Sequence, residues 1–111
     1  MAYRLVFLES PYAGDVEENL AYARACVADC LARGESAYGS HLLLTQPGIL
    51  DDSDPAERAK GIAAGQAFLA ACELSVVYVD RGVSPGMLLG IAAAHRIGVP
   101  VEYRRLGDVA C

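Results

Sequence analysis

The stretch Leu74-Ser-Val-Val-Tyr-Val-Asp80 decides the fold class of this chain. It is short, rich in β-branched residues and apolar almost throughout, which is typical of a strand covered on both faces. Residues 3–8 have the same character and stop at a Ser-Pro pair, so they predict a second buried strand. Two further strands are expected over 36–40 and 99–103.

Three helices alternate with the expected strands. Each begins at a residue whose side chain can accept a hydrogen bond from the first turn, namely Asp15, Asp54 or Ser84. Behind the first cap the apolar residues recur with helical spacing, and glycine ends the first and third segments. The helices are therefore expected over 15–34, 54–72 and 84–98. Residues 41–54 have no sustained period, which predicts a long functional loop with at most one helical turn.

Strands that alternate with helices form β–α–β units with right-handed crossovers, which predicts an α/β fold with one mostly parallel sheet of about four to five strands. The 111 residues suffice for a single domain over 1–111. A small doubly wound, Rossmann- or flavodoxin-like sheet with helices on both faces commonly has the strand order 2-1-3-4. Ligands of such sheets bind at the carboxyl ends of the strands where the order reverses. This rule brings the loops at 9–15 and 80–86 together, with His41 nearby.

The chain carries 9 Lys and Arg against 14 Asp and Glu, a formal net charge of −5. A chain with this net negative charge is not expected to form the basic surface that binds a nucleic-acid polymer, so we exclude such a partner. No stretch predicts a membrane span or a secretory signal, and we expect a cytoplasmic protein. Its cysteines are then expected to be free thiols that act as small core residues and not as metal ligands; they are Cys26, Cys30, Cys72 and Cys111. No cofactor is expected.

The two loops at the predicted crevice carry polar groups suited to a small anionic or hydroxyl-rich ligand. In the first loop, Ser10 and Tyr12 supply a hydroxyl and a phenol beside exposed backbone N–H groups, although turn chemistry explains them equally well. In the second loop, Arg81 and Ser84 form a cradle for a phosphate or a carboxylate. The alternative is a surface pair of Asp80 with Arg81 and a plain helix cap at Ser84.

Short motifs in and around both loops share a pattern. They are Ser10-Pro-Tyr-x-Gly-Asp15 followed by Asn19, His41-Leu-Leu, Leu50-Asp-Asp52, Asp80-Arg81, Ser84-x-Gly-Met87 and Ile97-Gly-x-Pro-Val101. Together they resemble the nucleoside 2-deoxyribosyltransferase-like superfamily, which includes 2′-deoxynucleoside 5′-phosphate N-hydrolases. Characterised members cleave N-glycosidic bonds of deoxynucleosides or their 5′-monophosphates with a glutamate nucleophile on a helix. The resemblance implies that the loop from Ser10 to Gly14, together with Ser84, holds the sugar and the 5′-phosphate.

The candidate site follows from the predicted crevice and from this resemblance. Asp80 and His41 are the candidate catalytic groups, with His41 either a general acid or base or a satisfied polar residue at a strand end. The candidate ligand-binding residues are Ser10, Pro11, Tyr12, Gly14, Asp15, Asn19, Arg81, Ser84, Gly86 and Met87. Asp15 has a second explanation as a helix cap. The expected ligand is a nucleoside, a nucleotide or a sugar phosphate.

One departure from the superfamily pattern changes the chemistry that is expected. The position of the glutamate nucleophile falls on Gly90, and glycine cannot attack an anomeric carbon. N-glycosidase activity then requires another carboxylate, either Asp80 or Glu9. The alternatives are a non-catalytic module that senses or sequesters a small nucleotide or sugar phosphate, and a dimeric structural protein with a remnant pocket.

Two helices offer surfaces to a second copy of the chain. The segment at 87–94 is apolar all round, so both of its faces should be covered. Gly61-x-x-x-Gly65 adds a small-residue surface that permits close helix approach. We therefore expect a homodimer through the second and third of the predicted helices. The resemblance implies the same, because superfamily members often complete each site from the next subunit.

Overall fold

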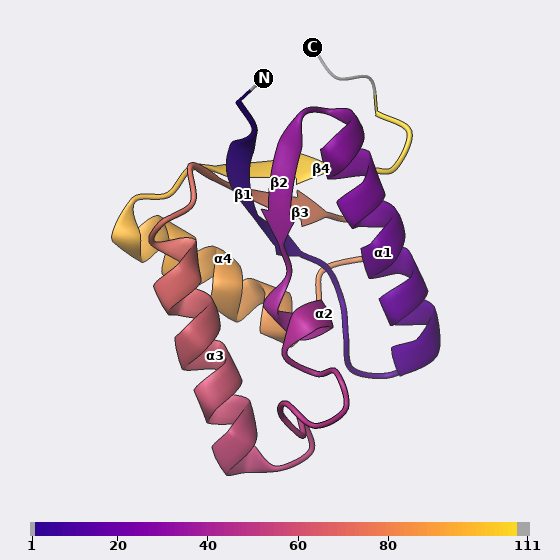
Figure 1. Cartoon of the computed structure of the whole chain (residues 1–111), viewed down its shortest axis with the longest axis vertical. Helices are drawn as coiled ribbons and strands as arrows, with labels where there is room; N and C mark the ends of the chain where they lie inside the picture. Colours follow the sequence, from indigo (N-terminus) through magenta and orange to yellow (C-terminus); the bar gives the residue numbers. More distant parts are fainter. Residues whose placement is uncertain (1, 109–111) are drawn as a thin grey trace.

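The computed structural model describes residues 2–108, in which four strands alternate with helices (Figure 1). The elements in chain order are β1 (Arg4–Glu9), α1 (Val16–Ala32), β2 (Glu35–Tyr38), α2 (Ser40–Leu43), α3 (Pro55–Leu69), β3 (Leu74–Tyr78), α4 (Pro85–Ile97) and β4 (Val101–Arg104). The predicted strands at 36–40 and 99–103 are thus shifted by one or two residues. The predicted loop at 41–54 begins inside one short helix, α2, which is about one turn long and so agrees with the expectation of at most one helical turn.

The sheet has the order β2-β1-β3-β4, and all neighbouring strands are parallel. The α/β class and the strand order predicted from the sequence are therefore confirmed. α1 covers one face of the sheet, and α3 and α4 cover the other (Figure 1). The strand order reverses between β1 and β3, so the chain leaves these two neighbouring strands toward opposite faces of the sheet.

The predicted starts of the three long helices are confirmed by capping hydrogen bonds. The side chains of Asp15, Asp54 and Ser84 each accept a hydrogen bond from a backbone N–H of the following turn. Gly98 ends α4 in the left-handed conformation, with φ 84°, which glycine adopts without the steric penalty of a Cβ. These local interactions fix where the chain turns from loop to helix beside the carboxyl edge of the sheet.

The side chains of β1 alternate between the two faces of the sheet and so divide the core. Val6 and Leu8 pack toward α1, where they meet the buried Cys26 and Cys30. Phe7 packs on the other face, against residues of α3 and α4. Because side chains alternate along a strand, the next residue on that second face is Glu9. The carboxyl group of Glu9 is therefore directed toward α3 and α4.

The cysteines that the structure describes are core residues, as expected. Cys26, Cys30 and Cys72 are buried free thiols, and Cys111 lies outside the described residues. Within 2–108, no group of three or more His, Cys, Asp and Glu side chains is arranged to hold a metal ion. No helix of this same range has the length and apolar character needed to cross a membrane.

Within this chain, α4 is covered on one face only. Met87 and Ile91 are buried against the sheet, whereas Leu88 and Leu89 are 58% and 55% exposed. The sequence predicted that one face of this helix lies on the sheet and that a second copy covers the other, and the single copy shows the first of these two contacts. The exposed leucines leave an apolar strip on the surface of α4.

The Gly61–Gly65 surface of α3 is used inside the chain. A Cβ added to Gly65 would lie 3.1 Å from Oγ of Ser40, and one added to Gly61 would lie 3.3 Å from the side chain of Leu50. The small residues therefore admit α2 and the loop that follows it. The sequence indicated a surface for close approach but not which part of the molecule approaches it.

A buried ion pair joins the two edge strands on the face covered by α1. Arg104 of β4 donates two hydrogen bonds of 2.7 Å to the carboxylate of Glu35 in β2, and the two side chains are 5% and 6% exposed. The hydroxyl of Tyr78 lies 3.4 Å from the same guanidinium. Burial by itself raises the pKa of Glu35, but the hydrogen bonds and positive charge of Arg104 outweigh burial and hold that pKa below its usual value.

We predict that Glu35→Ala lowers the free energy of unfolding by about 3 kcal/mol, because the buried guanidinium of Arg104 loses its buried, two-bond partner and keeps only the half-exposed Glu102. Glu102→Ala is the matched control. Glu102 binds the same guanidinium, but its side chain is 49% exposed, so the expected loss is below about 1 kcal/mol. Urea denaturation measures both losses, and equal losses would contradict the prediction.

The same pair has a pH dependence with a defined sign. Because the pKa of Glu35 is lowered in the folded state, its contribution to stability is present above about pH 4.5 and is lost as the pH falls through the lowered pKa.

Candidate functional site

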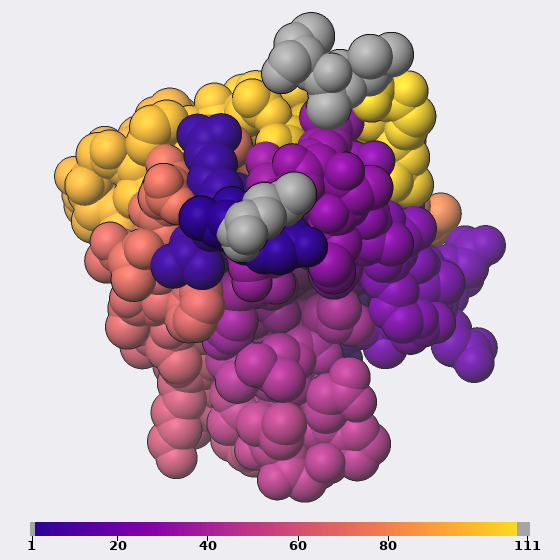
Figure 2. All heavy atoms as spheres, turned by 45° about the horizontal axis from the view of Figure 1, so that its top comes forward, coloured from indigo at the N-terminus to yellow at the C-terminus, as the bar shows by residue number. Residues whose placement is uncertain are grey.

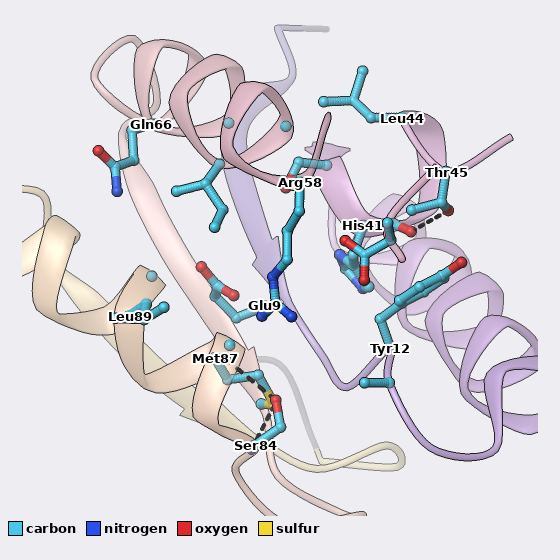
Figure 3. A pocket seen from close by; sticks show the side chains of 18 of the residues that line it. Glu9, Tyr12, His41, Leu44, Thr45, Arg58, Gln66, Ser84, Met87 and Leu89 are labelled. Carbon is cyan, nitrogen blue, oxygen red and sulfur yellow. Dashed lines mark hydrogen bonds between the residues drawn. The ribbon is translucent and has the colours of Figure 1, made fainter. Parts of the chain in front are cut away.

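A cavity of about 310 Å³ lies at the carboxyl edge of the sheet, beside the point where the strand order reverses. Its walls come from the loop after β1, from α2 and the loop that follows it, from α3, and from the first turns of α4 (Figure 3). In the space-filling view the magenta segment between α2 and α3 packs as a solid lobe with its neighbours (Figure 2). This loop thus forms part of a wall, with Leu44, Thr45 and Leu50 facing the cavity.

Half of the candidate residues line the cavity: Ser10, Tyr12, His41, Ser84, Gly86 and Met87. They belong to the loop after β1, to α2, and to the start of α4, three segments that are distant in the sequence. Their convergence follows from the rule that ligand sites of doubly wound sheets form where the strand order reverses.

The other candidates lie outside the cavity lining: Pro11, Gly14, Asp15, Asn19, Asp80 and Arg81. Asp80, expected as a catalytic group, is on the α1 side of the sheet. Its carboxylate accepts hydrogen bonds from the hydroxyl of Tyr22 and from the backbone N–H of Leu106. Desolvation raises the pKa of Asp80, but the hydrogen bonds lower it by more, so the net pKa lies below its usual value. These hydrogen bonds of Asp80 connect α1 to the segment that follows β4.

Asn19 and Arg81 form a second set of hydrogen bonds on the α1 side of the sheet. Nε of Arg81 donates to Oδ1 of Asn19 at 3.0 Å. The amide of Asn19 donates in turn to the backbone carbonyls of Tyr12 and Ala13, each at 3.1 Å. These bonds tie the loops after β1 and β3 to α1. Asn19 and Arg81 thus fix the backbone of Tyr12, whose side chain lines the cavity.

Ser10 and His41 form a hydrogen-bonded pair in the cavity wall. Oγ of Ser10 and Nε2 of His41 lie 2.6 Å apart, which joins the loop after β1 to α2. Burial lowers the pKa of His41 to about 4, so the imidazole is neutral at pH 7. A neutral imidazole and a hydroxyl each provide a donor and an acceptor. The pair can therefore bind a ligand hydroxyl without placing a charge beside it.

Glu9 presents a buried carboxyl group to the same cavity (Figure 3). The residue is 8% exposed, and its carboxyl makes no hydrogen bond or ion pair with any side chain or backbone group within 2–108. Desolvation raises the pKa of Glu9 to about 8, so this carboxyl is protonated at neutral pH. A protonated carboxyl is a hydrogen-bond donor and a proton source. Strand alternation from Phe7 was the sequence signal that could have directed this side chain to the cavity.

Arg58, Ile62 and Gln66 of α3 line the cavity but were not candidates from the sequence. They recur with helical spacing, so they share one face of α3. Figure 3 shows the side chain of Arg58 extending from α3 into the cavity. No Asp or Glu of the described chain forms an ion pair with this guanidinium. The helical period was visible in the sequence, but it could not tell whether that face meets the sheet, a partner or a ligand.

The fold is similar to that of a 2-deoxyribosyltransferase from the psychrotolerant bacterium Bacillus psychrosaccharolyticus. The TM-score is 0.65 at 14% sequence identity, and the match covers 96% of this chain and 77% of that chain. This likeness defines a deoxyribosyltransferase-like α/β fold. No curated protein matches the sequence. The chain belongs to the family DUF7768, a domain of unknown function, whose model matches residues 4–104.

The raised pKa of Glu9 predicts that stability falls as the pH rises from about 4.5 to about 8, because the folded state resists loss of this proton and the unfolded state does not. His41 acts over a lower range, between its pKa of about 4 in the folded state and 6.5 in the unfolded state. The interval from pH 6.5 to pH 8 therefore isolates Glu9.

We expect Glu9→Gln to remove the decline between pH 6.5 and pH 8, because glutamine does not ionise. The matched control is Glu17→Gln, at an exposed position in the first turn of α1 that lies outside the cavity. Thermal unfolding followed by circular dichroism at several pH values measures the effect. A Glu9→Gln profile that keeps the slope of the wild type would contradict the assignment.

Proposed function

We propose that this protein binds a nucleoside or a nucleoside 5′-monophosphate in the switch-point cavity. The observation that carries the proposal is the convergence of Ser10, His41 and Ser84, from three separate segments, on a cavity whose lining is mostly apolar. Small-molecule sites in α/β proteins have this composition, an apolar enclosure with a few convergent polar groups. The fold likeness supports the proposal, since the similar protein is a 2-deoxyribosyltransferase described as a biocatalyst for nucleoside synthesis.

The cavity wall offers separate environments to the parts of such a ligand. The Tyr12 ring provides an aromatic face on which a flat base can stack, and Ile62 and Leu89 add apolar surface. The Ser10–His41 pair suits sugar hydroxyls because it supplies uncharged donors and acceptors. These features favour a sugar that carries a planar base over a simple sugar phosphate.

Arg58 and the start of α4 suit a terminal phosphate. A guanidinium binds phosphate through paired, charge-assisted hydrogen bonds. Ser84 caps α4, and the backbone N–H groups at this helix start favour negative charge. The 5′-monophosphate is therefore the preferred form of the ligand in this proposal.

The second candidate function is a non-catalytic module that senses or sequesters the same class of ligand. Gly90 favours it, because the helix position that carries the nucleophile in the resembling superfamily has no side chain here. Binding alone needs no carboxylate. The first candidate includes N-glycosidase activity on the bound ligand and the second does not, so the release of free base distinguishes them.

We predict that Arg58→Ala weakens binding of the nucleoside 5′-monophosphate about tenfold, close to 1.4 kcal/mol, and leaves the affinity for the nucleoside nearly unchanged. Lys60→Ala is the matched control, because Lys60 is an exposed cation on the same helix that does not line the cavity. Isothermal titration calorimetry with ribo- and deoxyribonucleosides and their monophosphates measures the affinities. If neither nucleosides nor monophosphates bind the wild type, the proposed function is wrong.

We also propose a homodimer through α3 and α4 and a cytoplasmic location. The exposed Leu88 and Leu89 of α4 and the partly exposed Ile62 of α3 support the dimer, because they form apolar surface at and beside the cavity rim that a second copy would cover. The buried free thiols of Cys26 and Cys30 fit the reducing environment of the cytoplasm.

We predict that Leu88→Lys converts the dimer to a monomer, because it places a charge in the proposed apolar interface. Leu31→Lys is the matched control, since Leu31 is 54% exposed but lies on α1, on the opposite face of the sheet. Size-exclusion chromatography with light scattering measures the mass of each variant. A monomeric wild type would contradict the dimer.

A further inference from the structure

The carboxyl of Glu9 fills the space that a side chain at position 90 would occupy. A Cβ added to Gly90 would lie 2.9 Å from Oε1 of Glu9 and closer still to Cδ and Oε2. All of these distances are shorter than nonbonded carbon and oxygen atoms tolerate. The carboxyl in its present position and any side chain at position 90 are therefore mutually exclusive. Because position 90 of α4 is glycine and has no side chain, the carboxyl of Glu9 from β1 can occupy this space.

The geometry of β1 holds Glu9 in that position. Phe7 and Glu9 share the face of the sheet that α3 and α4 cover, and Glu9 pairs in register with Val77 of β3. The carboxyl thus enters the cavity from the end of β1, on the face of the sheet that α3 and α4 cover. A buried carboxyl without a partner destabilises a fold, and such groups concentrate at functional sites.

The other acidic side chains of the cavity are placed differently. Asp52 and Glu57 line it from the loop before α3 and from the first turn of α3, and both are half-buried. Glu57 also accepts a hydrogen bond from the backbone N–H of Asp51 at 3.2 Å. Glu9, by contrast, is the last residue of the central strand β1, next to Ser10, and its side chain faces α4.

We propose that Glu9 is the catalytic acid and base of N-glycosidic bond hydrolysis in this cavity, an inference that rests on the proposed binding of a nucleoside or its monophosphate. The protonated carboxyl donates its proton to a nitrogen of the base as the C1′–N bond breaks, and the electron pair of that bond leaves with the base. The sugar is left as an oxocarbenium ion beside the Glu9 carboxylate.

Water completes the reaction. Its oxygen forms a bond with C1′, and one of its protons passes to the Glu9 carboxylate, which restores the protonated acid. The products are the free base and the sugar, or sugar 5-phosphate, with a hydroxyl at C1′. The desolvated environment of Glu9 keeps the acid protonated at neutral pH before the ligand binds. The other titratable or charged side chains of the cavity are Tyr12, His41, Asp52, Glu57 and Arg58, and α4 contributes none to the lining.

The first test separates catalysis from binding. Base release from bound nucleosides and 5′-monophosphates is followed by liquid chromatography, and affinity by calorimetry. We expect Glu9→Gln to lower kcat at least 100-fold while the affinity changes less than about threefold. The control Glu17→Gln makes the same chemical change at an exposed site on α1 and should leave both unchanged.

The second test displaces the carboxyl without removing it. Gly90→Ala puts a methyl group where the Glu9 carboxyl lies, so activity should fall although alanine adds no reactive group. Glu9→Ala combined with Gly90→Glu returns a carboxyl to the same space from α4, and we expect it to recover at least a tenth of the wild-type rate. Circular dichroism melting verifies that each variant folds.

The outcomes distinguish this inference from the proposed function. If no ligand binds the wild type, both fail. If ligands bind the wild type but no base is released, the role of Glu9 is wrong and the binding function stands. Base release at equal rates by wild type and Glu9→Gln also overturns the role of Glu9.

Discussion

The pairing of β1 with β2 on one side and with β3 on the other is the constraint on which the rest of the molecule depends. Because the crossovers that leave β1 and β3 run over opposite faces, the carboxyl edge between them is left open to a ligand. Every side chain proposed to act on a ligand lies around that opening.

The two faces of the sheet have different roles. On the α1 face, polar side chains are bonded to one another, as in the Glu35–Arg104 pair and the contacts of Asp80 with Tyr22. These groups have their hydrogen-bonding capacity used by the protein, so they stabilise it. On the α3–α4 face the polar groups converge on a cavity, and Glu9 has no protein partner among the described residues. The buried carboxyl without a protein partner therefore lies on the cavity side of the sheet.

Glu9 and Gly90 can be understood only as a pair. A glycine in the interior of a helix is unfavourable relative to alanine, and a buried carboxyl without a partner is destabilising. Neither residue would stabilise the fold by itself at its position. Together they place an ionisable group in the cavity between β1 and α4. A catalytic carboxyl that comes from the strand would leave α4 free to pack closely over the sheet.

The sequence by itself determined the α/β class, the strand order, the three helix caps and the convergence of Ser10, His41 and Ser84. The class and the caps follow from short-range patterns, and the strand order and the convergence follow from the common arrangement of small doubly wound sheets. Only the tertiary structure decided that Asp80 bonds to Tyr22 of α1 and that the space beside Gly90 is occupied by the Glu9 carboxyl, although strand alternation already indicated the face to which Glu9 belongs. The direction of a side chain at a strand end, and the space left for it by a glycine 81 positions away in the chain, depend on how helices pack. That packing is a long-range property which no local pattern of residues encodes.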